Sequence, residues 1–182
     1  LDPQASIDLG GIAKGYIADR LRDYLVSKSC DSALINLGGN ILTVGEKPDG
    51  SAFRVGIRKP FSESDKQLET VTCKDRSVVT SGTYERYFEQ DGVRYHHILD
   101  PKTGRPAASG LQSVSVVSQD DTLADALSTA LFVMGLDAGA ALYRAGGLAF
   151  EAVFMTDDGS VWITPGLAGQ YQSDRPYQVL QP

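Results

Sequence analysis

Cysteine and histidine are scarce in this chain, which has only two of each among its 182 residues. Cys30 and Cys73 are far apart in the sequence and therefore do not form a zinc-binding motif, which needs closely spaced thiolates or imidazoles. The two cysteines could be two free buried thiols or one disulfide, and the sequence alone leaves both alternatives open.

Excess positive charge is also absent, because 23 acidic residues outnumber 17 lysines and arginines and give a formal net charge of −6. This sign argues against a nucleic-acid partner or an anionic membrane surface, since binding phosphates through the whole surface needs positive charge. An anionic ligand would need a local site. No apolar run approaches membrane-spanning length, and the chain has no internal repeat or low-complexity tract.

An apolar content of 42% over 182 residues is sufficient for one domain with a sizeable core. Alternating segments bounded by glycine, aspartate or proline predict strands, mostly in hairpins. The expected strands span 6–9, 32–39, 40–47, 53–60, 68–75, 77–82 and 111–118, with hairpins over 84–100 and 149–166. The fold class is therefore α+β, an antiparallel β-sheet built from hairpins with helices packed on it.

Helical periodicity predicts helices over 10–28, 122–135 and 137–145. In the first of them, four apolar side chains at helical spacing are expected to face the core: Ile17, Leu21, Tyr24 and Leu25. No domain boundary is expected within the chain.

The octet "DLGGIAKG" joins the first expected strand to the first helix. Gly10 and Gly11 open the helix after Asp8 and Leu9, so backbone N–H groups there can approach a ligand closely. Lys14 lies in the first turn, where a cation opposes the helix dipole unless an anion is nearby. The octet suits a phosphate, but a tight turn with a solvated lysine is the commoner interpretation, because neither GxGxxG nor a Walker motif is present.

The helix over 122–135 carries one polar face on an otherwise apolar segment. Asp125, Ser128 and Thr129 lie at i, i+3 and i+4, so three oxygen-bearing side chains share that face. One carboxylate and two hydroxyls suit Mg²⁺ or Ca²⁺ rather than zinc, with phosphate oxygens, carbonyls or water completing the shell. An equally weighted alternative is that Asp125 caps or faces solvent while both hydroxyls bond to helix carbonyls.

The segment "YHHILDPKTGRPA" contains both histidines. In an extended strand Tyr95, His97 and Leu99 share one face and His96 lies on the other. A histidine near a phosphoryl centre could take a proton from an attacking hydroxyl. The commoner outcome for such a pair is one exposed histidine and one partly buried core histidine.

Five motifs together resemble the ApbE family of FAD:protein FMN transferases. They are "DLGGIAKGYIADR", "INLGGNI", "TSGTYERYF", "YHHILDPKTGRP" and "ADALSTALFVMG", in the order and rough spacing of that family. The match runs from Asp8 to about Gly135 and continues weakly through the last hairpin. The combination is much more specific than any one motif.

The resemblance implies a magnesium-dependent enzyme that cleaves the pyrophosphate of FAD and releases AMP. FMN is left attached through a phosphoester bond to a threonine or serine of an acceptor protein, so FAD is a substrate and Mg²⁺ the cofactor. The metal ligands implied by the resemblance are the backbone of Gly11 and the side chains of Asp125, Ser128 and Thr129.

The resemblance also implies contacts to the flavin nucleotide at Asp8, Lys14 and Leu99. His97, as the histidine before the Asp-Pro turn, is then the candidate group beside the incoming hydroxyl. Two alternatives are an FAD pyrophosphatase, which uses water instead of the acceptor, and a non-catalytic flavin-binding or structural module.

Members of the ApbE family carry a substantial segment before the "DLGG" motif. We therefore expect residues 1–182 to form a single ApbE-like domain from the C-terminal part of a longer protein. By resemblance, the full-length protein is expected outside the cytoplasm, anchored to a membrane as a lipoprotein. Its acceptor is expected to be a flavoprotein subunit of a membrane redox complex or a similar protein.

Overall fold

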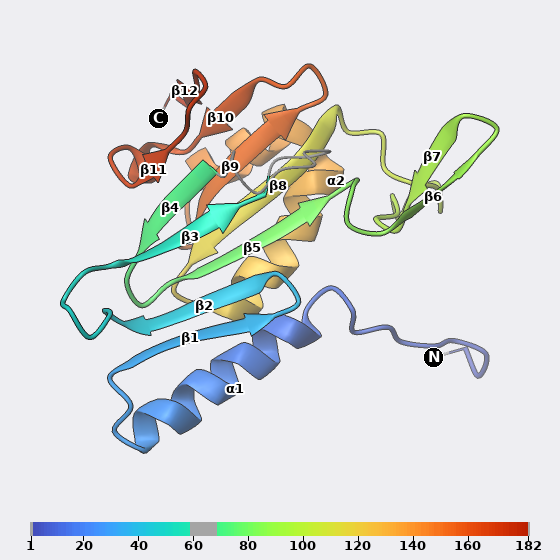
Figure 1. The fold of residues 1–182 in the computed structure, drawn as a ribbon. Coiled ribbons are helices and arrows are strands. Elements are labelled where there is room, and N and C mark those ends of the chain that lie inside the picture. The colour runs from blue at the N-terminus through green and yellow to red at the C-terminus, as the bar shows by residue number, and fades with distance from the viewer. Residues whose placement is uncertain (1, 59–68, 182) are drawn as a thin grey trace.

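The computed structural model describes residues 2–58 and 69–181 and has a seven-stranded main sheet (Figure 1). Neighbouring strands of this sheet are antiparallel, except that β10 and β12 run parallel. In spatial order the strands are β1 (Ser32–Leu37), β2 (Asn40–Gly45), β5 (Ser77–Gly82), β8 (Leu111–Ser118), β9 (Glu151–Thr156), β10 (Val161–Ile163) and β12 (Gln178–Val179).

A second, three-stranded sheet covers one face of the main sheet, and the helices cover the other (Figure 1). The small sheet has the order β11 (Tyr171–Gln172), β4 (Glu69–Cys73) and β3 (Phe53–Ile57). Apolar side chains of the two sheets form one core, and those of the main sheet and the long helix α2 (Asp121–Ala145) form another. Alternation along each central strand supplies both cores, because successive side chains point to opposite faces.

A two-stranded hairpin of β6 (Tyr87–Gln90) and β7 (Val93–His96) projects from the end of the main sheet (Figure 1). Its turn lies at Asp91 and Gly92, as the sequence predicts, and both residues have positive φ. The hairpin thus places the paired histidines away from the centre of the sheet.

The α+β class and most of the expected strands are confirmed, but two predictions are wrong. The described strands form three sheets, whereas the sequence predicts one. Residues 6–9 are an exposed irregular segment that pairs with none of the described strands. The short strands β11 and β12 and the 3₁₀ turn Pro165–Leu167 were not expected. Parts of the expected strands 53–60 and 68–75 lie outside the described residues.

Helix α2 joins the two helices expected over 122–135 and 137–145. Gly135 kinks it with φ of 81° and ψ of 174°, so the predicted break is present inside one continuous element. The expectation that no segment reaches membrane-spanning length needs correction. Helix α2 is long and apolar enough to cross a membrane, by length and composition only, with a mean hydropathy of 1.4. Its packing against the sheet and α1 is that of a core helix.

Helix α1 (Ala13–Ser27) buries a different face from the expected one. Its buried residues are Gly15, Ala18 and Asp19, whereas Ile17 and Tyr24 are 49% and 59% exposed. Leu21 is also exposed and Leu25 is half-buried. The small residues Gly15 and Ala18 occupy buried positions because α1 lies close against α2 and β2.

Gly15 marks the closest approach of the two helices. A Cβ atom at this position would lie 2.3 Å from the backbone oxygen of Asp121 and 2.8 Å from Cβ of Asp125. Neither atom belongs to a flexible side-chain end, so a larger residue would force the helices apart.

We therefore expect Gly15→Ala to lower the free energy of unfolding by about 1–3 kcal/mol, as overpacking of a close contact does. Gly11→Ala is the matched control, because a Cβ there would meet nothing within 4 Å. Urea unfolding of both variants measures the difference. Equal stability of Gly15→Ala and the unmodified chain would contradict the close packing of α1 on α2.

Candidate functional site

The start of α1 meets the polar face of α2. The amide of Gly15 donates a hydrogen bond of 2.9 Å to Oδ2 of Asp125, whose side chain is only 4% exposed. Gly11 lies one turn earlier, before the first residue of α1. The structure thus brings the "DLGG" motif and Asp125 to one place, although 110 residues separate Gly15 from Asp125 in the chain.

The hydroxyls of Ser128 and Thr129 meet a third hydroxyl from β5. Oγ of Ser81 lies 2.9 Å from Oγ of Ser128 and 3.3 Å from Oγ1 of Thr129. Sequence reasoning did not single out Ser81 as a site residue, although it lies inside the motif "TSGTYERYF". Its place in that motif, near the end of the strand that contains the buried residues Val78 and Val79, was the available signal.

The carboxylate of Asp125 and the hydroxyls of Ser128 and Thr129 are hard oxygen donors, which is the type of ligand that Mg²⁺ prefers. Ser128 also donates to the carbonyl oxygen of Asp125 at 2.9 Å, so the alternative of back-bonding holds for this one residue. Asp125 and the half-buried Thr129 are therefore better placed than Ser128 to bind a metal ion. Among the described residues no three His, Cys, Asp or Glu side chains gather as a metal cluster, so a metal here depends on hydroxyl, backbone or phosphate oxygens.

Asp8 and Lys14 flank the glycine pair. Oδ1 of Asp8 accepts a hydrogen bond of 2.6 Å from the amide of Gly10, which fixes the turn that precedes α1. Asp8 is exposed and Lys14 is half-buried in the first turn of the helix. Contact of either residue with a flavin nucleotide stays a prediction.

The two histidines occupy opposite environments, as the alternating pattern predicts. His96 is 8% exposed, and its Nε2 lies 3.2 Å from the carbonyl oxygen of Ala107. Its ring meets the edge of Phe132 on α2 at a centroid distance of 5.6 Å. Burial lowers the pKa of His96, so this histidine is a neutral core residue near pH 7.

His97 is exposed on the same face as Tyr95 and Leu99. Its Nδ1 lies 3.2 Å from the carbonyl oxygen of Arg86. A carbonyl oxygen can only accept, so Nδ1 carries the proton and Nε2 of the neutral ring has a free lone pair. The imidazole is therefore held in the tautomer that a proton acceptor needs.

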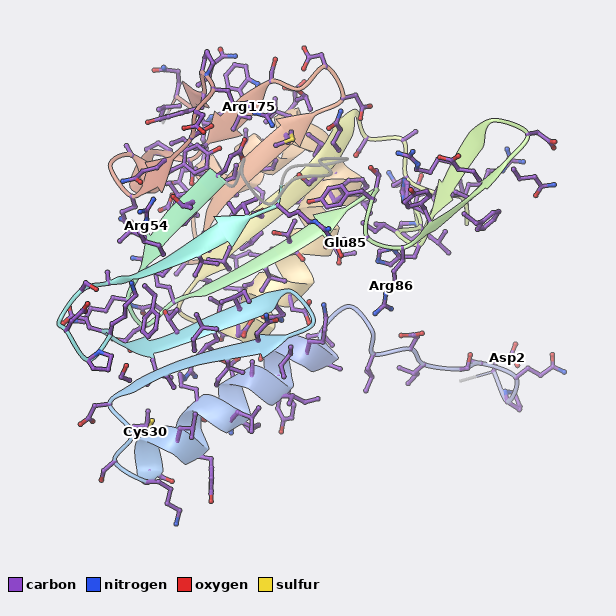
Figure 2. The ribbon with its side chains drawn as sticks, viewed as in Figure 1. Asp2, Cys30, Arg54, Glu85, Arg86 and Arg175 are labelled. Atoms are coloured by element: carbon purple, nitrogen blue, oxygen red, sulfur yellow. The ribbon has the colours of Figure 1, made fainter. Side chains whose placement is uncertain are left out.

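The oxygen face is the face of α2 that carries Asp125, Ser128 and Thr129. The hairpin is connected to it through the end of β5. The chain runs directly from Ser81 and Gly82 to Arg86, which Figure 2 shows beside Glu85 at the base of the hairpin. Leu99 follows the hairpin and pairs with Pro106 in an isolated β-bridge while staying 54% exposed. The predicted site residues thus come from the start of α1, the middle of α2 and the base of the hairpin.

A surface hollow of about 790 Å³ lies elsewhere, against the first turn and the end of α2. Its lining includes Arg76, Gln119, Tyr143, Arg144 and Glu151, and none of the predicted site residues. We assign the chemistry to the oxygen face because that face gathers the predicted donors, which the hollow does not.

The cysteine alternatives are also resolved. Cys30 and Cys73 are both free thiols, the first after α1 and the second in β4. Figure 2 shows Cys30 at the C-terminal end of α1. Burial raises the pKa of Cys73 to about 11, which makes it an unreactive core thiol at neutral pH.

The fold is that of the ApbE flavin transferases. The ApbE family profile matches residues 1–154, and the chain belongs to the ApbE family. It is 44% identical to an FAD:protein FMN transferase of Klebsiella pneumoniae over 179 residues, 98% of this chain and 54% of that protein. It is also 44% identical to an FAD:protein FMN transferase of Treponema pallidum, covering 88% of this chain and 46% of that protein.

Solved structures agree with the sequence comparison. The ApbE protein of Thermotoga maritima is similar with a TM-score of 0.81 and 37% identity, over 92% of this chain and 54% of that one. The flavin transferase ApbE of Vibrio cholerae is similar with a TM-score of 0.79 and 34% identity, over 92% and 53% of the two chains. The chain spans about half the length of the curated relatives it matches.

Proposed function

We propose that this chain forms the metal-binding and phosphate-binding part of a magnesium-dependent FAD:protein FMN transferase. The observation that carries the proposal is the meeting of Asp125 with the start of α1 at the Gly15 amide, beside the hydroxyls of Thr129 and Ser81. Homology to proteins named FAD:protein FMN transferase supports the same activity.

The residues that would hold Mg²⁺ are Asp125, Thr129, Ser128 and the backbone carbonyl of Gly11. A bound Mg²⁺ supplies charge neutralisation on the pyrophosphate oxygens. Asp125 is oriented for this role by the Gly15 amide, and Thr129 by the hydroxyl of Ser81. Ser128 contributes less to the metal in this arrangement, because its hydroxyl already donates to the Asp125 carbonyl.

The pyrophosphate of FAD would lie at the start of α1. The amide of Gly11 precedes the helix, where N–H groups and the helix dipole favour an anion. The Gly10 amide already donates to Asp8. Lys14 adds a positive charge in the first turn, and Asp8 keeps the glycine pair in shape through the Gly10 amide. Leu99 would supply an apolar contact to the nucleotide.

His97 would take the proton of the incoming hydroxyl. The hydroxyl oxygen of an acceptor threonine or serine forms a bond to the phosphorus of the FMN half, and the bond to the bridging oxygen breaks. The electron pair leaves with AMP, and the hydroxyl proton goes to Nε2 of His97. The Nδ1 hydrogen bond to the Arg86 carbonyl keeps Nε2 unprotonated before the step and stabilises the imidazolium that forms.

We further propose a flavoprotein subunit of a membrane redox complex as the acceptor, and an extracytoplasmic, lipid-anchored location for the full-length protein. Family resemblance supports both proposals. Acceptor labelling in a membrane fraction and cell fractionation would test them.

The activity is tested by incubating the protein with FAD, Mg²⁺ and an acceptor peptide that contains one reactive threonine. We expect a peptide mass increase equal to one FMN minus water, together with release of AMP, and no product in EDTA. FMN and AMP without labelled peptide would favour the pyrophosphatase alternative. Magnesium binding without FAD turnover would favour the non-catalytic module.

A further inference from the structure

A second oxygen-lined cluster lies deeper, where α1, α2, β2 and β5 meet. It consists of Asp121 at the start of α2, Asn40 at the start of β2 and Ser77 at the start of β5, all 0% exposed. We call these three residues the buried cluster. It is separate from the oxygen face of Asp125 and Thr129, which lies one turn further along α2.

The polar atoms of the buried cluster are not satisfied within the part of the chain that the structure describes. Both carboxylate oxygens of Asp121, both amide atoms of Asn40 and the hydroxyl of Ser77 lack a hydrogen-bond partner there. Asn40 and Ser77 nevertheless lie within hydrogen-bond reach of the Asp121 carboxylate, and both lower its pKa. The three side chains therefore lie within reach of one another, but none of their polar atoms makes a hydrogen bond of good geometry. Buried polar groups in this state call for a further partner.

The charges around the cluster leave Asp121 without a counter-charge. Asp19 forms an ion pair with Arg22 at 2.9 Å and accepts hydrogen bonds from the Asp121 amide and from the amide and hydroxyl of Thr122. Burial alone would raise the pKa of Asp19, but these partners lower it. Asp125 accepts a hydrogen bond from the Gly15 amide. Burial, and then the charge of Asp19, raise the pKa of Asp121 to about 7.

One positive charge would balance the site. A carboxylate, an amide oxygen and a hydroxyl are hard donors, which alkali ions accept in irregular geometry. Mg²⁺ suits the cluster poorly, because it demands an octahedral shell and keeps several waters. A fully buried carboxylate is otherwise costly unless it is paired or protonated.

We propose that the buried cluster binds one monovalent alkali cation, Na⁺ or K⁺, through the carboxylate of Asp121, the amide oxygen of Asn40 and the hydroxyl of Ser77. The ion ties the start of α2 to β2 and β5 and so supports the elements that carry Asp125. This inference does not depend on the flavin transfer activity, because it concerns stability and ion binding.

Thermal unfolding tests the proposal at pH 8, where a proton competes least for Asp121. The chain is freed of Mg²⁺ with the tetramethylammonium salt of EDTA, then melted in equal concentrations of NaCl, KCl or choline chloride. We expect NaCl or KCl to raise Tm by about 2–5 °C over choline chloride, as binding to the folded state alone does.

Two aspartate variants of α2 localise the effect. Asp121→Asn removes the charge in the same shape and is expected to fold but to lose the alkali response. Asp137→Asn is the matched control, because Asp137 is exposed on the same helix and its variant keeps the response. A crystal grown with Rb⁺ is expected to show an anomalous peak between Asp121, Asn40 and Ser77.

Three results would overturn the proposal. One is an unmodified chain with the same Tm in NaCl, KCl and choline chloride, which means that Asp121 is balanced by a proton. Another is an Asp121→Asn variant that keeps the full alkali response. The third is a Rb⁺ crystal with no anomalous density in the cluster, which leaves at most a buried water there.

Discussion

Asp125→Ala is expected to reduce magnesium-dependent FMN transfer to the background seen in EDTA. Asp125 is the only carboxylate among the four proposed metal ligands, so its loss removes the charge that holds a divalent cation. The measurement is AMP release and peptide labelling across a Mg²⁺ titration, with isothermal calorimetry of Mg²⁺ binding beside it. No recovery is expected at high Mg²⁺.

A stability effect has to be separated from this loss, because Asp125 also accepts the Gly15 amide. Truncation to alanine leaves that buried donor unpaired at a cost of about 1–3 kcal/mol. Asp125→Asn keeps an acceptor oxygen for Gly15 but removes the charge, so it is expected to stay folded and inactive. Full magnesium-dependent transfer by a folded Asp125→Asn variant would show that the metal lies elsewhere.

Local periodicity predicted the oxygen face correctly. Asp125, Ser128 and Thr129 share one face because a helix repeats every 3.6 residues, and that rule needs no knowledge of the rest of the fold. The alternation of His96 and His97 followed in the same way from the period of a strand. The hairpin turn at Asp91 and Gly92 was predictable because few residue pairs accept positive φ.

The buried face of α1 could not be predicted from hydropathy. The pattern favours Ile17, Leu21 and Tyr24 as core residues, yet α1 buries Gly15 and Asp19. Asp19 is buried because Arg22, Thr122 and the start of α2 satisfy its oxygens. Those partners on α2 lie 102 and 103 residues away in sequence, beyond the reach of a local pattern.

The same limit applies to the rest of the site. Ser81 and the Gly15 amide complete the surroundings of Asp125 and Thr129, but each does so only through a long-range contact. The strand expected over 6–9 is wrong for a related reason. Alternation gives a strand only where the segment pairs with another strand, and residues 6–9 pair with none of the described strands.

His97→Ala is expected to slow FMN transfer by about 10²–10⁴-fold at saturating FAD, with little change in FAD binding. The imidazole is exposed and its Nδ1 is engaged by the Arg86 carbonyl, so Nε2 is the atom that we propose takes the proton of the incoming hydroxyl. His97→Gln should be as slow as His97→Ala, because its amide can still donate to Arg86 but cannot accept a proton.

His96 provides the matched comparison on the neighbouring position. It packs against Phe132 and bonds the Ala107 carbonyl, so His96→Ala is expected to lower stability by creating a cavity while leaving the rate per folded molecule much less affected. Transfer time courses at saturating FAD, corrected for the folded fraction, measure both variants. Equal, mild slowing by the two substitutions would mean that neither histidine takes the proton, and that the metal and the positioning of the substrates carry the reaction.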